Sequence, residues 1–113
     1  MVESYGAGGF RVSGIEFGGS VLILPDRSVD WRVGAAEEVD EASLSEVVGA
    51  AGAVEILLLG TGRRMLAIPA ALRIALKRAG IMLEPMDTGA ACRTYNVLIA
   101  EDRRVAAALI LPR

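Results

Sequence analysis

Histidine is absent from this sequence of 113 residues, and cysteine occurs once, at Cys92. The usual histidine and cysteine zinc spacings are therefore excluded, as are catalytic triads that need a histidine base. A single cysteine cannot form an internal disulfide, which fits a reducing, cytoplasmic compartment. We expect Cys92 to be a small buried side chain rather than a reactive thiol.

Aromatic residues are also scarce, at 4% of the chain, although hydrophobic residues of all kinds make up 53%. Alanine, valine, isoleucine and leucine must therefore fill the core, and so much apolar side chain argues against disorder. No apolar run approaches the roughly 20 residues of a membrane-spanning helix. The N-terminus has neither the basic region nor the apolar region of a secretory signal peptide. We expect no transmembrane segment.

Charge is divided unevenly along the chain. Residues 1–57 hold 3 basic and 10 acidic side chains, whereas residues 58–113 hold 9 basic and 4 acidic ones. Either the two halves complement each other within one fold, or the second half forms a basic face for an anionic ligand or a partner. The net charge of −2 does not favour nucleic-acid binding. The acidic residues gather within residues 37–46, which we interpret as a solvated face rather than a magnesium site.

The length predicts one domain, because 113 residues are too few for two. We expect a flexible, glycine-rich N-terminus over residues 1–9 and a single α/β domain over residues 10–113. After an N-terminal β-hairpin, about three helices alternate with apolar strands. This order predicts a layered fold with a mostly parallel or mixed central sheet.

The hairpin is predicted from alternating apolar residues. One strand runs from Phe10 to Phe17, with a possible bulge at Gly14. Gly18-Gly19 joins it to a return strand over residues 20–24, and a third short strand follows over residues 29–33.

The helices are predicted from their caps and the later strands from continuous apolar runs. Either Asp40 or Ser43 can cap the first helix, and Ser43 and Glu46 have the spacing of a capping box. The run over residues 54–59 is apolar except for Glu55 and does not alternate, which indicates a strand covered on both faces. The predicted helices begin near Ser43, Pro69 and Asp87, and the remaining predicted strands cover residues 54–59, 81–86 and 105–111.

The segment Gly60-Thr61-Gly62 follows an apolar strand and precedes a helix, and Arg63 and Arg64 come next. Ligands of open α/β sheets bind at the carboxyl ends of strands, where glycines can expose backbone N–H groups. The two arginines suit a phosphate or carboxylate. The segment lacks the third glycine of a dinucleotide fingerprint and the lysine of a P-loop. A tight turn with solvent-facing arginines therefore remains the other interpretation.

The segment from Asp87 to Asn96 begins with the tripeptide of aspartic proteases. That chemistry needs two carboxylates, and this tripeptide occurs once, so we interpret Asp87 or Thr88 as a helix cap. The later polar side chains either form structural hydrogen bonds or line a binding pocket. Tyr95, like Trp31, either anchors a partner or packs in the core with its polar tip bonded.

The blocks that extend from Asp87 to Leu98 and from Glu101 to Leu109 resemble the domain of unknown function 498 family, also called the Mth938-like domain. The same holds for shorter pieces: Gly9–Val12, Gly19–Val21, Trp31, Gly60–Arg63 and Pro69. The resemblance covers about residues 5–111. It implies a three-layer α/β fold around a mixed central sheet. It also implies a relationship to mitochondrial complex I assembly factor three, a protein-binding factor at the inner membrane with no agreed catalytic residues.

We therefore expect a non-catalytic, cofactor-free protein that assists the assembly of membrane respiratory complexes, in the cytoplasm or peripherally at the inner membrane. The alternative is a small-molecule or anion-binding protein, with or without catalysis, that uses the Gly60-Thr61-Gly62-Arg63 loop. A homo-oligomer is a third hypothesis. The expected ligand- or partner-binding residues are Gly60, Thr61, Gly62, Arg63, Arg93, Thr94, Tyr95, Asn96 and Arg104, and Arg64 and Arg103 adjoin them.

Overall fold

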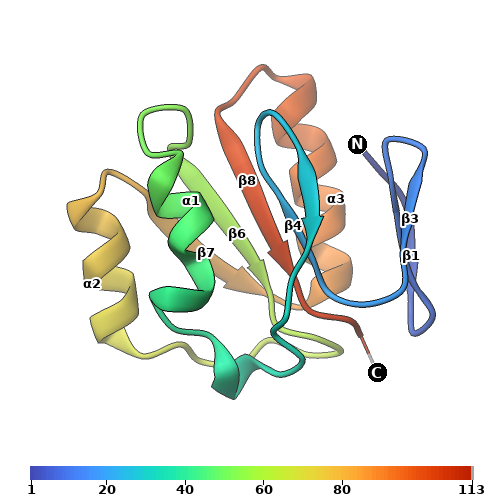
Figure 1. The fold of residues 1–113 in the computed structure, drawn as a ribbon, viewed down its shortest axis with the longest axis horizontal. Helices are drawn as coiled ribbons and strands as arrows, with labels where there is room; N and C mark the ends of the chain where they lie inside the picture. Colours follow the sequence, from blue (N-terminus) through green and yellow to red (C-terminus); the bar gives the residue numbers. More distant parts are fainter. Residues whose placement is uncertain (113) are drawn as a thin grey trace.

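Two β-sheets and three α-helices form the fold in a computed structural model, which describes residues 1–112 (Figure 1). Arg113, the last residue of the predicted domain, lies outside the described residues. The first sheet is antiparallel and contains β1 (Val2–Gly6), β2 (Gly9–Val12) and β3 (Ile15–Phe17). The second has the order β5-β4-β8-β6-β7, with β4 (Val21–Ile23), β5 (Ser28–Asp30), β6 (Ile56–Gly60), β7 (Met82–Met86) and β8 (Val105–Leu109).

The five-stranded sheet is mixed, as predicted. Strand β6 lies parallel to both β7 and β8, whereas β4 is antiparallel to β8 and to β5. Each of Leu57, Leu58 and Leu59 is at most 1% exposed. Successive side chains of a strand point to opposite faces, so β6 is covered on both sides. The unbroken apolar run Ile56–Leu59 is explained by this double burial.

Three layers result. On one face of the five-stranded sheet, α1 (Ser45–Gly49) and α2 (Ala70–Arg78) pack with Leu57 and Leu59 in one apolar cluster. On the other face, α3 (Thr88–Ala100) and the three-stranded sheet pack with Leu58 in a second cluster. The predicted α/β class, with a mixed central sheet, an N-terminal hairpin and three helices, is confirmed.

The N-terminus differs from the expectation of a flexible segment over residues 1–9. Strand β1 begins at Val2 and pairs with β2. On its other side, the N–H of Val2 donates to Oδ1 of Asn96 at 2.8 Å, and Nδ2 of Asn96 donates to the carbonyl of Val2 at 2.9 Å. The Val2 side chain is only 4% exposed. The side chain of Asn96 thus occupies the edge of β1 that no strand covers. This contact joins residues 94 positions apart, so the local sequence does not reveal it.

The hairpin turns also lie at other positions than predicted. Ser13 and Gly14 both have positive φ angles, of 47° and 83°, and they join β2 to β3 as a two-residue turn. Gly14 is therefore part of a turn rather than a bulge. Gly18-Gly19 does not close a hairpin either, because it links the two sheets. The single strand predicted from Phe10 to Phe17 is in fact two strands.

The first predicted helix is shorter, and of its two candidate caps the structure favours Asp40 over a box formed by Ser43 and Glu46. Two 3₁₀ turns, η1 (Ala36–Glu38) and η2 (Ala42–Leu44), precede α1. The N–H of Ser43 donates to Oδ1 of Asp40 at 2.8 Å, and the N–H of Asp40 donates to Oγ of Ser43 at 3.0 Å. Glu46 instead pairs with Arg27 at 2.8 Å. The reciprocal capping pair is thus three residues earlier than the predicted Ser43–Glu46 box.

The other two helices begin where their caps predicted. Helix α2 follows Pro69, and Gly80 lies after its end with a φ of 83°. Helix α3 follows Asp87, whose Oδ1 accepts the N–H of Ala90 at 2.9 Å. The interpretation of Asp87 as a helix cap is therefore confirmed.

Candidate functional site

The parallel strands β6, β7 and β8 end at one edge of the sheet, where Thr88 joins the segments that follow them. Thr88 is fully buried. Its Oγ1 accepts the N–H of Gly62 at 2.9 Å and donates to the carbonyl of Ile110 at 2.6 Å. The N–H of Thr88 donates to the carbonyl of Gly62 at 2.8 Å. The Thr88 side chain therefore holds the glycine loop, residues 60–63, against the start of α3 and the end of β8.

Gly60 is required for this close approach. A Cβ at position 60 would lie 2.9 Å from Oγ1 and 3.0 Å from Cα of Thr88. Contacts that short are repulsive, and the second involves backbone that cannot rotate away. Gly60 thus has a packing role, which allows the start of α3 to approach the end of β6.

Thr61 orders the loop that follows. Its Oγ1 lies 2.7 Å from the carbonyl of Arg64, to which it donates, and it accepts the N–H of Leu66 at 3.1 Å. The N–H of Thr61 donates to the carbonyl of Met86 at 2.9 Å. Together with the bond from Gly62 to Thr88, these contacts use the N–H groups of Thr61 and Gly62 within the protein. These two N–H groups are therefore not free to bind an anion at this loop.

The far side of this loop, residues 63–66, is exposed. Within residues 1–112, neither guanidinium of Arg63 and Arg64 has an ion pair or a hydrogen bond. Met65 is 58% exposed and Leu66 is 37% exposed. Arg63, Arg64 and Leu66 line an open depression of about 660 Å³ with Thr61. We call residues 63–66 the arginine loop.

The polar residues of α3 face the N-terminal strand. Nη1 of Arg93 donates to the hydroxyl of Tyr5 at 2.6 Å, and the Asn96 amide holds Val2 as described above. Tyr95 is 8% exposed within the second apolar cluster, and burial raises the pKa of its hydroxyl. Thr94 is half-buried. Arg93 and Asn96 thus attach β1 to α3, and Tyr95 packs in the core.

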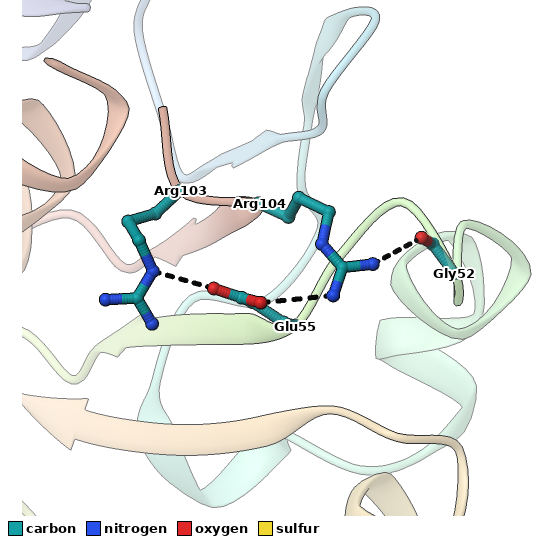
Figure 2. Close-up of polar contacts among 4 residues, drawn as sticks. All are labelled: Gly52, Glu55, Arg103 and Arg104. Atoms are coloured by element: carbon teal, nitrogen blue, oxygen red, sulfur yellow. Dashed lines mark hydrogen bonds and ion pairs between the residues drawn. The ribbon is translucent and has the colours of Figure 1, made fainter. Parts of the chain in front are cut away.

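Arg103 and Arg104 lie at the opposite ends of the strands. Arg104 precedes β8, whose first residue pairs with Ile56, at the start of β6. Nε of Arg103 and Nη2 of Arg104 bind the two carboxylate oxygens of Glu55, at 2.7 and 3.1 Å (Figure 2). Nη1 of Arg104 donates to the carbonyl of Gly52 at 2.8 Å. Hydrogen bonds from Arg103 and Arg104 lower the pKa of Glu55.

The predicted binding residues therefore fall into three places. Gly60 to Arg63 form the loop at the carboxyl edge of the sheet, Arg93 to Asn96 face the N-terminal strand, and Arg104 lies at the other end of β8. Sequence reasoning did not single out Met65, Leu66 or Tyr5, and it treated Thr88 only as a cap. The sequence around Met65 and Leu66 does not indicate that their side chains are exposed. Nor does it reveal the bond between Tyr5 and Arg93, which are 88 positions apart.

Two further side chains behave as core residues. Cys92 is 1% exposed, and burial raises the pKa of its thiol to about 12. Nε1 of Trp31 donates to the carbonyl of Ser43 at 2.8 Å, while its ring is 8% exposed.

In residues 1–112, no cluster of histidine, cysteine, aspartate or glutamate suits a metal ion. Nor does this part of the chain contain a helix with the length and apolar character needed to cross a bilayer.

Comparisons with known proteins agree with the fold. The chain is 38% identical over 109 residues to an uncharacterized protein of Rhodobacter capsulatus, a match to 96% of this chain and 82% of that protein. It is 38% identical over 112 residues to NADH dehydrogenase (ubiquinone) 1 alpha subcomplex assembly factor 3 of Danio rerio. That match covers 99% of this chain but only 64% of the fish protein.

A solved structure supports the same relationship. The crystal structure described as an outer membrane protein of Bartonella henselae matches with a TM-score of 0.92 at 37% identity, over 99% of this chain and 94% of that one. The family model described as "Protein of unknown function (DUF498/DUF598)" matches residues 2–110. These matches span all the strands and helices, so the chain belongs to the DUF498/DUF598 family.

Proposed function

We propose that this chain is a binding protein that assists the assembly of a membrane respiratory complex. The observation that carries the proposal is the similarity over 99% of the chain to a protein named as an assembly factor of NADH dehydrogenase. Every strand and helix of this fold lies within the matched region. We further propose that the protein acts in the cytoplasm, at the surface of the inner membrane.

We place the contact with the partner at the arginine loop. Arg63 and Arg64 are exposed and unpaired within residues 1–112, so binding a partner carboxylate breaks no internal ion pair. Met65 and Leu66 supply exposed apolar surface beside them. Arginine and methionine are enriched in protein interfaces, and arginine is among the residues that dominate their binding energy.

The other predicted binding residues support the fold in this proposal. Arg93 is bonded to Tyr5, Asn96 to Val2, and Arg104 to Glu55 and Gly52. A partner that used these side chains would first have to break the bonds that attach β1 or join the strand ends. The arginine loop needs no such rearrangement, since Thr61 and Thr88 already hold its backbone.

Deletion of the gene, followed by complementation, tests the proposal. The amount of assembled NADH dehydrogenase complex, measured on native gels, should fall in the deletion strain and recover with the wild-type gene. Arg63→Ala/Arg64→Ala should fail to restore it at equal protein level. Arg11→Ala/Arg27→Ala removes the same charge from other exposed positions and should restore it. Normal assembly in the deletion strain would refute the assembly role.

A further inference from the structure

Helix α2 has an apolar side chain on its outer face. Leu72 and Leu76 are 6% and 0% exposed and point into the core. Ile74 lies two positions from each of them, about 200° around the helix, and is 51% exposed. Ala70 and Ala71 are exposed on the turn before it, and the basic residues 77 and 78 are exposed on the turn after it. The outer face of α2 therefore changes from small side chains, through Ile74, to positive charge.

An acidic segment adjoins the other end of this helix. Residues 37–41 contain four acidic side chains and no basic one, and all four are exposed. Residues 39–42 line a groove of about 430 Å³ together with Pro69, Ala71 and Leu72, at the beginning of α2. Negative charge, an apolar centre and positive charge thus follow one another along α2.

The helix dipole explains part of this arrangement. Acidic groups near the N-terminus of α2 and basic groups in its last turn are each favourable within a single chain. The dipole does not explain an isoleucine that is half exposed at the centre of the outer face. Within residues 1–112, the side chains of Glu37, Glu41, Lys77 and Arg78 also have no ion pair or hydrogen bond.

We infer that α2 packs antiparallel against α2 of a second copy of this chain, around a twofold axis at Ile74. A twofold interface is self-complementary, so each contact occurs twice. Rotation of the second copy by 180° places its acidic segment beside Lys77 and Arg78, and its Lys77 and Arg78 beside the first copy's acidic segment. The two Ile74 side chains meet at the centre, and Ala70 and Ala71 allow the helices to approach closely.

The expected dimer is weak and depends on salt. Helix α2 has nine residues, which gives a length of about 14 Å. Two such helices with flanking loops form a smaller contact than the roughly 800 Å² per partner of a standard stable interface. Exposed charges supply much of the attraction, and they are largely screened at about 1 M salt. This surface shares no residue with the arginine loop, so the dimer does not depend on the function proposed above.

A cysteine at the axis tests the geometry. Ile74→Cys places two thiols next to each other across the twofold axis, so mild oxidation at low salt should give a disulfide-linked dimer. The native Cys92 is 1% exposed and should not react. Val97→Cys is the matched control, since Val97 is 56% exposed but lies on α3. Equal crosslinking of both variants, or none at position 74, would refute the inference.

Charge reversal tests the pairing across the axis. Lys77→Glu/Arg78→Glu and Glu37→Lys/Glu41→Lys should each sediment as a monomer at a concentration where the wild type dimerises. An equimolar mixture of the two should dimerise again. The introduced glutamates of one variant then face the introduced lysines of the other, and the unchanged Lys77 and Arg78 face the unchanged acidic segment. Circular dichroism checks that each variant is folded.

Three results would overturn the interface. The first is a mixture that remains monomeric. The second is an Ile74→Glu variant that dimerises as well as the wild type, which would require another surface. The third is a wild type that stays monomeric but binds phosphatidylglycerol vesicles through Lys77 and Arg78, which would make this face a lipid-binding surface.

Discussion

The chain contains two pairs of adjacent arginines, Arg63-Arg64 and Arg103-Arg104, and they have opposite environments. Each pair adjoins a central strand, the first after β6 and the second before β8. At the second pair, Glu55 lies at the start of the neighbouring strand and binds both side chains (Figure 2). At the first pair, the described residues offer no carboxylate partner. The availability of an arginine pair to a partner thus depends on whether the neighbouring strand supplies a carboxylate, and not on the arginines themselves.

Gly60→Ala should have the largest effect, because it disturbs the base of the arginine loop. The new Cβ would lie 3.0 Å from Cα of Thr88, so α3 must move away from β6. Overpacking of this kind costs about 3 kcal/mol of unfolding free energy. Urea denaturation measures the loss. Gly49→Ala is the control, because a Cβ there has no neighbour within 4 Å. Equal stability of the two variants would show that the loop tolerates a side chain at position 60.

Thr88→Val should have the next largest effect. Valine retains the shape but removes the hydroxyl, which leaves the N–H of Gly62 and the carbonyl of Ile110 without that partner. Each buried polar group left unsatisfied costs about 1 kcal/mol or more, so the two together cost about 2 kcal/mol. Urea denaturation should show this loss, and amide hydrogen exchange at Gly62 should become faster. Thr88→Ser, which keeps the hydroxyl, should show slow exchange. Unchanged exchange in Thr88→Val would contradict the proposed support of the loop.

Glu55→Gln should have a smaller effect that depends on pH, because it removes the carboxylate that binds Arg103 and Arg104. The arginines lower the pKa of Glu55 in the folded state. Its stabilisation is therefore present above the unfolded-state pKa of about 4.3 and is lost as the pH falls through the folded-state value. The wild type should be more stable than Glu55→Gln at pH 7, and the difference should vanish at acidic pH. Thermal unfolding at several pH values measures this. A difference that stays constant with pH would contradict the ion-pair account, and Glu101→Gln is the control.

Arg63→Ala/Arg64→Ala should have the smallest effect on stability, because the side chains have no partner within the described residues. The melting temperature should stay within error of the wild type. Arg103→Ala/Arg104→Ala should lower it, since Glu55 loses both partners. This pair of variants has the same change in charge, so the comparison isolates the environment. A larger loss in the first variant would mean that the arginine loop is structural.

Much of the fold could be predicted from the sequence, because its signals are local. The apolar run of β6, Pro69 before α2 and Asp87 before α3 each identify an element from a few neighbouring residues. The first strand was missed for a physical reason. Asn96 binds both backbone groups of Val2 across 94 positions, and no pattern within residues 1–9 reveals that contact.

Less of the candidate site could be predicted. The sequence identified the glycine loop at a strand end and the arginines beside it. It grouped Arg93 and Arg104 with them, although the first binds Tyr5 and the second binds Glu55. A guanidinium looks the same in a sequence whether it is bonded or free. Only the tertiary arrangement, with Glu55 at one end of the parallel strands and an exposed loop at the other, separates the two classes.

Affinity capture from native membranes tests the central claim most directly. The bait is the wild type, Arg63→Ala/Arg64→Ala or Arg103→Ala/Arg104→Ala, each confirmed to be folded, and mass spectrometry quantifies the NADH dehydrogenase subunits recovered. We predict recovery with the wild type and with the Arg103/Arg104 variant, and loss with the Arg63/Arg64 variant. Equal recovery with all three baits, or loss only with the Arg103/Arg104 variant, would contradict the account.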